Sequence, residues 1–556
     1  MTEPPRGSRR ASLALAAAVA ALACLPYLQT ARFGPTYDDH AHVLDNVFVH
    51  HPENARFLLS WRYLHLEIPD QGRPVFVASL LLDRALFGDA FGGYHLQSVV
   101  WHAIAALLVL ALARSLGLTR WTSSAAGALF ALHPACTEAV ASVSNREDPL
   151  ATVFALVALL TARRFLRGGA GWLAPTAIAF ALALGSKESA LAAPLLLGAL
   201  ALASPRWRPA SPRRWVPLGA VGALVGGLFV AFQLRLGAPS LLVGAGGGPL
   251  APAGGGGPLA PWLWVGEGLR VATVGGGVDA WAALPIEALR VARVLLGWPL
   301  SAEHDPSPLV GPLPAALWAL ALAGLAGLFA VAHRRAPRVA LGLSWLAAAT
   351  VPTLASPWLL NPIADRFLYL PAVGVCVALA AALAPRRAAR APRLVLLALL
   401  AVFAARTADR VPVWRDDAAL FADAVRHAPR SARAWQNLGA AELEAGRLDE
   451  ARRALRRAIA LDARLLAARV NLGRVELRAG DVDAAVEALE AAVRTPVVAG
   501  ERDLHDRAFR LLARVLSRAG RRARLRAVVA EELARRPASR LARAWAARLG
   551  SLERPE

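Results

Sequence analysis

Lysine is nearly absent from this chain. Of 62 basic residues, Lys187 is the single lysine and all the others are arginine. A coding bias against lysine explains the general pattern, and chance survival could explain the exception. However, Lys187 lies among small residues between two apolar runs, where a charge costs free energy. We therefore consider Lys187 a better functional candidate than any single arginine.

Cysteine and nucleotide-binding motifs are also scarce. The three cysteines, Cys24, Cys136 and Cys376, lie in or beside apolar segments and lack the spacing of a metal site or a disulfide framework. The glycine-rich stretch at 244–258 lacks the glycine-lysine end of a phosphate loop, so we interpret it as a flexible linker. No Rossmann glycine fingerprint occurs, and no nucleotide site is predicted.

Apolar residues make up 56% of the chain, and the mean hydropathy is +0.43. Apolar runs of about 20 residues recur between short arginine-rich loops, which indicates a helical membrane protein. The sequence after about residue 406 is charged and alanine-rich instead. We predict an all-α fold with a polytopic membrane domain at 1–406 and a second domain at 407–556.

The arginines predict the topology. We place about eleven spans at 11–31, 94–114, 122–137, 149–166, 172–185, 189–203, 215–235, 311–332, 339–357, 367–384 and 393–406. With the N-terminus in the cytoplasm, every short arginine cluster falls on the cytoplasmic side, as the positive-inside rule requires. The net charge of +22 then reflects topology and solvated helix faces, not nucleic-acid binding.

Two segments need separate comment: the first apolar run and the long loop at 236–310. The run at 11–28 could be a cleaved signal peptide, but an uncleaved first span fits the later spans better. The loop at 236–310 includes a candidate interfacial helix at 281–298. Eleven spans place the second domain outside. We predict a bacterial inner membrane, with the N-terminus in the cytoplasm and the repeats in the periplasm.

The second domain contains internal repeats. Ala434 to Gly439 recurs as Ala468 to Gly473, and Leu455 and Leu489 keep the same 34-residue offset. This period is typical of tetratricopeptide repeats, which stack into an α-solenoid and bind proteins or peptides. Asp449 and Asp483 are predicted N-caps of the second helices. A third helix pair is expected at about 505–536, followed by a capping helix near 538–550.

Two adjacent carboxylates, Asp38 and Asp39, follow the first span. A carboxylate just outside a membrane helix suits a general base that acts on a lipid-linked substrate. The pair could also bind a divalent metal, because oxygen ligands suit Mg²⁺ or Mn²⁺. The alternative is a solvated charged loop. His42 lies nearby, but no zinc-type spacing supports a histidine metal site.

An ordered set of motifs resembles a known family. The motifs are Tyr37-Asp38-Asp39-His40, Gly72-Arg73-Pro74-Val75, Leu82 to Gly88, Tyr94-His95-Leu96, Leu132-His133-Pro134, Glu138 to Ala141, Asn145-Arg146-Glu147-Asp148, Ser186-Lys187-Glu188 and Asp365 to Pro371. Followed by tetratricopeptide repeats, they resemble the transmembrane and tetratricopeptide-repeat protein O-mannosyltransferases and their bacterial relatives. Family members usually carry a tryptophan after the Glu138 motif, where this chain has Ser142-Val143-Ser144.

The resemblance implies a C-type glycosyltransferase fold, a polyprenyl-phosphate sugar donor and a protein hydroxyl acceptor on the non-cytoplasmic side. Lys187 and Arg366 are suited to neutralise the leaving phosphate, and Asp38 or Asp39 to accept the acceptor's proton. The remaining candidate substrate-binding residues are Glu138, Arg146, Asp148, Glu188 and Tyr369. For Glu138, Arg146 and Asp148, the alternative is an ion-pair network that braces two helix ends, and for Lys187-Glu188 it is a salt bridge within the turn. No cofactor is predicted, and a divalent metal at Asp38 and Asp39 is kept as an alternative.

Two other functions compete with this hypothesis. The chain could be a membrane-anchored tetratricopeptide scaffold for envelope assembly, with structural charges only. It could also be a flippase or polymerase of envelope glycans. Transporters usually carry ionisable residues near mid-span, whereas here they gather at one predicted membrane face. The enzyme hypothesis is therefore favoured.

Overall fold

The computed structural model describes residues 6–66, 68–236, 293, 300–301, 312–351, 364–384, 390–496 and 502–551. Within these ranges the chain forms helices and no strand, which confirms the predicted all-α class. Contacts divide the chain into two compact units that meet between Ala419 and Leu420. The candidate interfacial helix at 281–298 and the linker at 244–258 lie outside the described residues, apart from residue 293.

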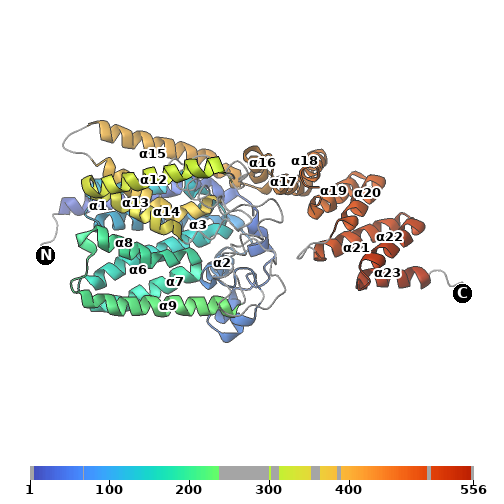
Figure 1. Ribbon diagram of the computed structural model, residues 1–556, viewed down its shortest axis with the longest axis horizontal. Coiled ribbons are helices and arrows are strands. Elements are labelled where there is room, and N and C mark those ends of the chain that lie inside the picture. Colours follow the sequence, from blue (N-terminus) through green and yellow to red (C-terminus); the bar gives the residue numbers. More distant parts are fainter. Residues whose placement is uncertain are drawn as a thin grey trace. The chain divides into compact units, whose positions relative to one another are not determined.

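The first unit is a bundle of apolar helices that lie along a common direction (Figure 1). Its helices are α1 (Arg6–Cys24), α2 (Pro74–Phe87), α3 (Phe91–Ser115), α4 (Arg120–Ala131), α5 (Thr137–Ala141), α6 (Glu147–Leu166), α7 (Leu173–Ser186), α8 (Ala193–Ala203), α9 (Trp215–Arg235), α12 (Pro312–Arg335), α13 (Pro337–Thr350), α14 (Tyr369–Ala382) and α15 (Arg390–Arg410). Helix α2 was not predicted, because its sequence falls in the first outside loop.

Each predicted span overlaps one of these helices, although residues 352–357 of the span at 339–357 lie outside the described residues and the span at 122–137 extends past the end of α4. Five of them are long and apolar enough to cross a membrane by length and composition: Arg10–Arg32, Phe91–Ser115, Ser144–Leu166, Pro212–Arg235 and Asp365–Ala382. Helices α7 and α8 belong to shorter apolar segments. The prediction of a polytopic helical unit is confirmed, and the count of about eleven spans stays a prediction.

Helices α13 and α14 cross in close backbone contact. A Cβ atom on Gly374 would lie 2.5 Å from the carbonyl oxygen of Gly342, and a Cβ on Gly342 would collide with the carbonyl of Gly374. Small residues allow such close approach between helices in a membrane. The contact matters for the site because the chain segment that leads into α14 carries Arg366 and Phe367.

The second unit is an array of paired helices. After α16 (Asp417–His427), which spans the boundary, come α17 (Ala432–Glu444), α18 (Leu448–Leu461), α19 (Leu466–Ala479), α20 (Val482–Arg494), α21 (Arg502–Arg518), α22 (Arg522–Arg535) and α23 (Arg540–Ser551). The two repeats, the third pair and the capping helix are thus confirmed. A Cβ on Gly439 would lie 2.5 Å from Leu455, and one on Gly473 would lie 2.6 Å from Leu489, so each glycine permits a helix crossing.

The predicted N-caps at Asp449 and Asp483 are wrong. Helix α18 begins after Arg447, and α20 begins after Asp481, whose side chain accepts a hydrogen bond from the Ala484 N–H at 2.9 Å. Both predicted residues instead lie in the first helical turn. A carboxylate there is favoured by the helix dipole, which produces a similar sequence signal without the capping geometry.

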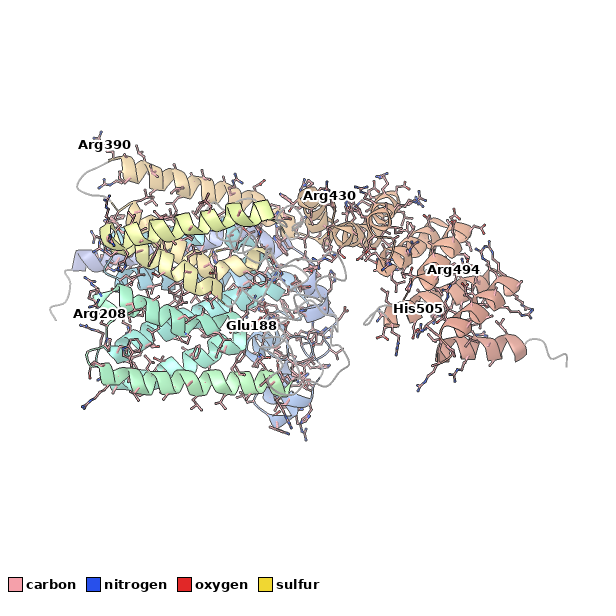
Figure 2. The ribbon with its side chains drawn as sticks, viewed as in Figure 1. Glu188, Arg208, Arg390, Arg430, Arg494 and His505 are labelled. Carbon is pink, nitrogen blue, oxygen red and sulfur yellow. The ribbon has the colours of Figure 1, made fainter. Side chains whose placement is uncertain are left out.

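The predicted cytoplasmic arginines gather at one end of the bundle. Figure 2 shows Arg208 and Arg390 at this end and Glu188 toward the other. Arg334, Arg335 and Arg338 flank the short connection between α12 and α13. The arrangement is compatible with the positive-inside rule.

We predict that the arginine-bearing end faces the cytoplasm and that the chain after Arg410 lies outside. Reporter fusions placed after Arg338 and after Arg410 should therefore report opposite sides, because α13, α14 and α15 separate the two positions. Paired alkaline phosphatase and fluorescent protein fusions would measure this. Two fusions that report the same side would contradict the proposed topology.

Candidate active site

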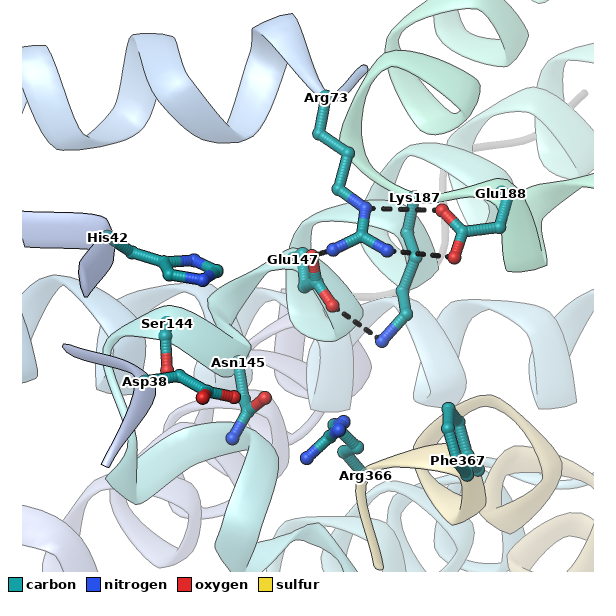
Figure 3. Close-up of a pocket in the computed structure, with 10 residues that line it drawn as sticks. All are labelled: Asp38, His42, Arg73, Ser144, Asn145, Glu147, Lys187, Glu188, Arg366 and Phe367. Atoms are coloured by element: carbon teal, nitrogen blue, oxygen red, sulfur yellow. Dashed lines mark hydrogen bonds and ion pairs between the residues drawn. The ribbon is translucent and has the colours of Figure 1, made fainter. Parts of the chain in front are cut away.

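The end of the bundle opposite the arginine clusters contains a charged cavity with about 340 Å³ of empty space, part of it open to solvent. Figure 3 shows its side chains gathered around one space. They come from the loop after α1, the start of α2, the α5–α6 turn, the α7–α8 turn and the segment before α14. The lining residues are Asp38, His42, Arg73, Ser144, Asn145, Glu147, Lys187, Glu188, Arg366 and Phe367.

The two adjacent carboxylates have different surroundings. Asp39 is fully buried, and its Oδ1 accepts hydrogen bonds from the Ser144 N–H at 2.7 Å and the Ser142 hydroxyl at 3.4 Å. Its Oδ2 accepts from the Thr36 N–H at 3.1 Å and the Thr36 hydroxyl at 3.4 Å. Asp39 therefore connects the loop after α1 to the turn before α6. The serines that replace the family's usual tryptophan form part of this connection.

Asp38 instead faces the cavity. Among the described residues its side chain has no hydrogen-bond or ion-pair partner within bonding distance. Burial raises the pKa of Asp38 to about 6, although the positive charges of Arg366 and His42 act in the opposite direction. A carboxylate with a pKa near neutrality and no fixed partner is suited to accept a proton from a substrate.

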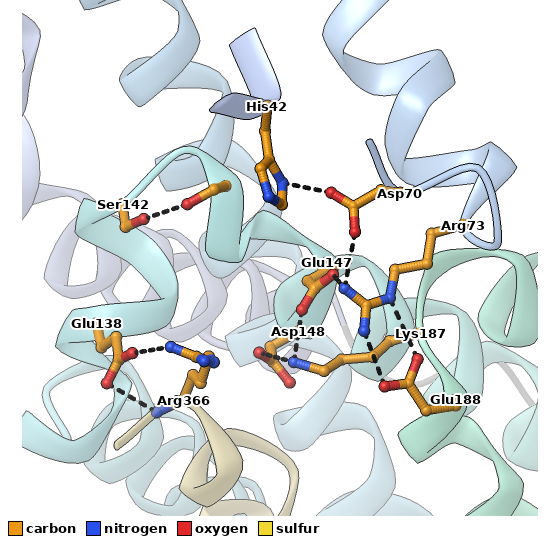
Figure 4. Close-up of polar contacts among 11 residues, drawn as sticks. His42, Asp70, Arg73, Glu138, Ser142, Glu147, Asp148, Lys187, Glu188 and Arg366 are labelled. Atoms are coloured by element: carbon orange, nitrogen blue, oxygen red, sulfur yellow. Dashed lines mark hydrogen bonds and ion pairs between the residues drawn. The ribbon is translucent and has the colours of Figure 1, made fainter. Parts of the chain in front are cut away.

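Lys187 is almost completely buried and is held by two carboxylates. Its Nζ lies 2.7 Å from Glu147 Oε1 and 2.6 Å from Asp148 Oδ2 (Figure 4). Both acids stand at the start of α6, whose N-terminus favours negative charge. The ammonium also lies 5.7 Å from the centroid of the Phe367 ring. These contacts hold the lone lysine at the wall of the cavity.

Arg73 joins several elements around the same space. Its Nη2 lies 2.8 Å from Glu188 Oε1, its Nε donates to Glu188 Oε2 at 3.2 Å, and its Nη1 donates to Asp70 at 3.0 Å. It also pairs with Glu147. The Arg73 guanidinium therefore links the loop before α2, the start of α6 and the turn after α7.

His42 adds a further cation to the cavity wall through its pair with Asp70. Burial would lower the pKa of His42, but the charge of Asp70 and the hydrogen bond to it outweigh burial and raise this pKa to about 9. Burial would raise the pKa of Asp70, yet His42 and Arg73 lower it to about 2. At neutral pH the pair is thus ionised, and His42 presents positive charge near Asp38.

Arg366 faces the cavity from the segment before α14. Its Nη1 donates to Glu138 Oε1 at 2.8 Å, and its backbone N–H donates to Glu138 Oε2 at 3.1 Å. Its guanidinium carbon lies 5.4 Å from the centroid of the Phe367 ring. Lys187 and Arg366 therefore approach the same aromatic ring, and both line the cavity.

The sequence-predicted residues divide into three groups. Asp38, Lys187, Glu188 and Arg366 line the cavity. Asp39, Glu138 and Asp148 do not line it but hold the loop or a lining cation in place.

Arg146 and Tyr369 lie away from the cavity. Arg146 is fully buried and donates to the Ser98 hydroxyl at 2.9 Å, to Gln97 at 2.6 Å and to the Tyr94 carbonyl at 2.7 Å, and it pairs with Asp83. These contacts brace α2, α3 and α6. Tyr369 is buried in the bundle, where its hydroxyl is 2.8 Å from His102 Nδ1. Neither residue lines the cavity, so their predicted contact with substrate stays a prediction that the cavity does not support.

Sequence reasoning missed several lining residues. Arg73 and Glu147 stand inside motifs that carried the family resemblance, so that signal could have assigned them to the site. The sequence suggested His42 only as a metal ligand. Its ion pair with Asp70 had no sequence signal, because the two residues are distant in the sequence.

The described residues contain no group of three or more His, Cys, Asp or Glu side chains placed to hold a metal ion. Asp38 and Asp39 do not act as a pair here, since one carboxylate faces the cavity and the other is surrounded by Thr36, Ser142 and Ser144. The donor set therefore does not favour the metal site considered from the sequence.

Two family models match the chain. Residues 72–231 match the dolichyl-phosphate-mannose-protein mannosyltransferase model, and residues 415–464 and 441–499 match the tetratricopeptide repeat. The first match includes six of the ten lining residues: Arg73, Ser144, Asn145, Glu147, Lys187 and Glu188.

The chain is similar to the protein O-mannosyltransferases. Protein O-mannosyl-transferase Tmtc1 of Drosophila melanogaster is 38% identical over 207 residues, which are 36% of this chain and 24% of the relative. Tmtc2 of the same species is 36% identical over 189 residues, 32% of this chain and 20% of the relative. TMTC3 of Mus musculus is 32% identical over 133 residues, 23% of this chain and 14% of the relative.

These matches confirm the family resemblance predicted from the motifs. The chain spans about a quarter or less of the length of these relatives. Together with the apolar helices, the match to the mannosyltransferase model indicates a multi-pass membrane protein.

We predict that Asp39 contributes to stability. Asp39→Ala should leave the buried Thr36 and Ser144 N–H groups without an acceptor, at about 1–3 kcal/mol for each unsatisfied group. The purified protein in detergent should therefore unfold at a lower temperature. Asp45→Ala is the matched control, because Asp45 is an exposed carboxylate in the same loop. Equal melting temperatures for the two variants would show that Asp39 does not anchor the loop.

Proposed function

We propose that the chain is a membrane glycosyltransferase that moves a sugar from a polyprenyl-phosphate donor to a hydroxyl group of a protein. The carrying observation is the cavity that Asp38, which has no fixed partner among the described residues, lines together with two held cations, Lys187 and Arg366. The names of the matched family and of the relatives support mannose as the sugar and dolichyl phosphate, a polyprenyl phosphate, as the class of carrier.

Asp38 would act as the general base. Its carboxylate takes the proton of the acceptor hydroxyl while that oxygen forms a bond to the anomeric carbon of the sugar. The bond from the anomeric carbon to the phosphate oxygen breaks, and its electron pair leaves with the polyprenyl phosphate. One displacement inverts the anomeric configuration and requires no covalent enzyme intermediate.

Lys187 and Arg366 would stabilise the leaving phosphate. Negative charge grows on the phosphate as the sugar departs, and cations that are already in position lower the barrier without reorganisation. Both side chains are held by carboxylates and both approach Phe367, so they are oriented before the donor binds. His42 would hold further positive charge on the same wall.

The repeats would bind the protein acceptor. Tetratricopeptide arrays present extended surfaces to peptides or proteins, and the repeat match covers residues 415–499 in two overlapping segments. The alternative function is a scaffold without catalysis. The scaffold hypothesis gives no reason for a cationic cavity lined by a carboxylate that has a raised pKa and no partner within the described part of the chain.

The location of the reaction follows from the proposed topology. The cavity lies at the end opposite the arginine clusters, which would place it on the non-cytoplasmic side together with the repeats. The relatives described above are animal proteins. The assignment to a bacterial inner membrane therefore stays a prediction from the sequence.

Asp38→Asn should abolish most sugar transfer at normal expression and thermal stability. Loss of a general base typically costs about 10²–10⁴-fold in rate, which is roughly 3–5 kcal/mol of barrier. The assay is transfer from a radiolabelled polyprenyl-phosphate mannose into protein in membranes. Asp45→Asn, an exposed carboxylate in the same loop, is the matched control. Near-normal transfer by Asp38→Asn would return weight to the scaffold hypothesis.

Transfer should also depend on pH through Asp38. The base acts only when deprotonated, and its pKa is about 6, so activity should fall as the pH drops through 6. Between pH 7 and pH 5 the deprotonated fraction falls by about tenfold, and kcat should fall with it. His42, with a pKa of about 9, stays protonated over this range. A kcat that is constant between pH 5 and pH 7 would exclude Asp38 as the base.

A further inference from the structure

The loop that carries Asp38 is held by a residue near the C-terminal end of the first unit's sequence. Asp417 is the first residue of α16, 380 residues away along the chain from Tyr37. Its Oδ1 accepts a hydrogen bond from the Tyr37 N–H at 2.7 Å, and its Oδ2 lies 2.8 Å from His40 Nε2. Nearby, the Gly34 N–H donates to the Arg415 carbonyl at 3.3 Å. All of these residues belong to the first compact unit.

The backbone at Tyr37 explains why such a contact is needed. Tyr37 has a φ of 53°, a left-handed conformation that is uncommon for a residue with a side chain. Such conformations persist when surrounding contacts fix them. The carboxylate of Asp417 binds the N–H of this residue, and its second oxygen binds His40, on the other side of Asp38.

Asp38 therefore stands between two anchors. On one side, Asp417 holds the Tyr37 N–H, and on the other side Asp39 is bound by Thr36 and Ser144. The Asp38 side chain has no such contact of its own among the described residues, so its direction depends on the backbone around it. A base whose position depends on its neighbours is sensitive to any change in them.

We propose that Asp417 is a positioning residue for Asp38, which it acts on by holding the backbone of Tyr37 and the ring of His40. This inference rests on the proposed function, because it assigns Asp38 the role of base. Asp417 touches neither the cavity nor a substrate. It fixes the turn that aims Asp38 into the cavity and keeps Asp38 out of bulk solvent.

Asp417 lies where the chain passes from the membrane helices into the repeat segment. The tetratricopeptide match begins at residue 415 and α16 begins at Asp417. The same residue thus starts the first helix of the matched repeat segment and holds the loop that carries Asp38. The geometry of the base is tied to the point where the chain passes from α15 into that segment.

The test compares two variants of the full-length protein in detergent with wild type. Asp417→Ala removes the acceptor for Tyr37, whereas Asp417→Asn keeps one carbonyl oxygen for it. Hydrogen exchange of the peptide that contains Tyr37 measures the loop directly, without any assay of activity. We expect faster exchange in Asp417→Ala and near-native exchange in Asp417→Asn, with both variants folded by their melting temperatures.

Kinetics then separate positioning from general stability. Misplacement of a reacting group can cost about 10²-fold, so kcat of Asp417→Ala should fall by that order while the donor KM changes little. The acidic limb of the pH profile should move to lower pH, because Asp38 gains solvent and its pKa returns toward the ordinary value near 3.9. Asp417→Asn should restore most of kcat and the native pH profile.

Asp416→Ala is the matched control. Asp416 caps the same helix by accepting from the Ala419 N–H at 2.8 Å, and it pairs with Arg415. This variant should keep native exchange at Tyr37 and native kcat. Unchanged exchange in Asp417→Ala, or faster exchange with an unchanged kcat and pH profile, would overturn the proposal. If wild type transfers no sugar, the proposed function fails, and the exchange at Tyr37 alone decides whether Asp417 holds the loop.

Discussion

The need to pair every buried charge determines the structure of the cavity. Lys187, Arg73 and Arg366 each have at least one carboxylate partner, and these partners come from different helix ends. Removing one member of a buried ion pair typically costs about 3–5 kcal/mol, because the other charge is left without compensation. The ends of α5, α6 and α7 and the segments before α2 and α14 must therefore meet in one arrangement.

The same pairing prepares the site for chemistry. A cation that is already held beside an aromatic ring and a carboxylate does not need to move when a phosphate arrives or gains charge. The carboxylates also reduce the net charge of the cavity, so its cations can remain together before a substrate binds. Asp38 is the exception, since it lines the cavity without a fixed partner among the described residues. Under the proposed function, that exception would let the site accept a proton, which a purely structural ion-pair network has no need to do.

Much of this architecture could be predicted from the sequence. Hydropathy located the helices of the membrane unit because an apolar segment between arginine-rich loops has few alternatives to a span. A constant 34-residue offset located the repeat helices because a fixed period fixes the helix pairs. Lys187 stood out by composition, and the structure shows it buried between Glu147 and Asp148.

The division of roles within motifs could not be predicted in the same way. Asp38 and Asp39 are adjacent and chemically identical, yet one faces the cavity and the other is enclosed by Thr36, Ser142 and Ser144. Arg146 and Arg366 were both predicted to bind substrate, but Arg146 braces three helices away from the cavity. Such differences depend on backbone direction and on partners distant in sequence, which residue type and local spacing do not encode.

Asp417 shows how far this dependence extends. No local signal relates an acidic residue after α15 to a loop after α1, because the two are brought together by the tertiary structure and not by nearness in the sequence. Because Tyr37 adopts a left-handed backbone conformation, the direction of Asp38 is not a property of the Tyr37-Asp38-Asp39-His40 motif alone. The motif supplies the carboxylate, and in our proposal Asp417 at the start of α16 supplies the contact that orients it. Under the proposed function, the geometry of the base would therefore depend on contacts from Thr36, Ser144 and Asp417, which lie far apart in the sequence.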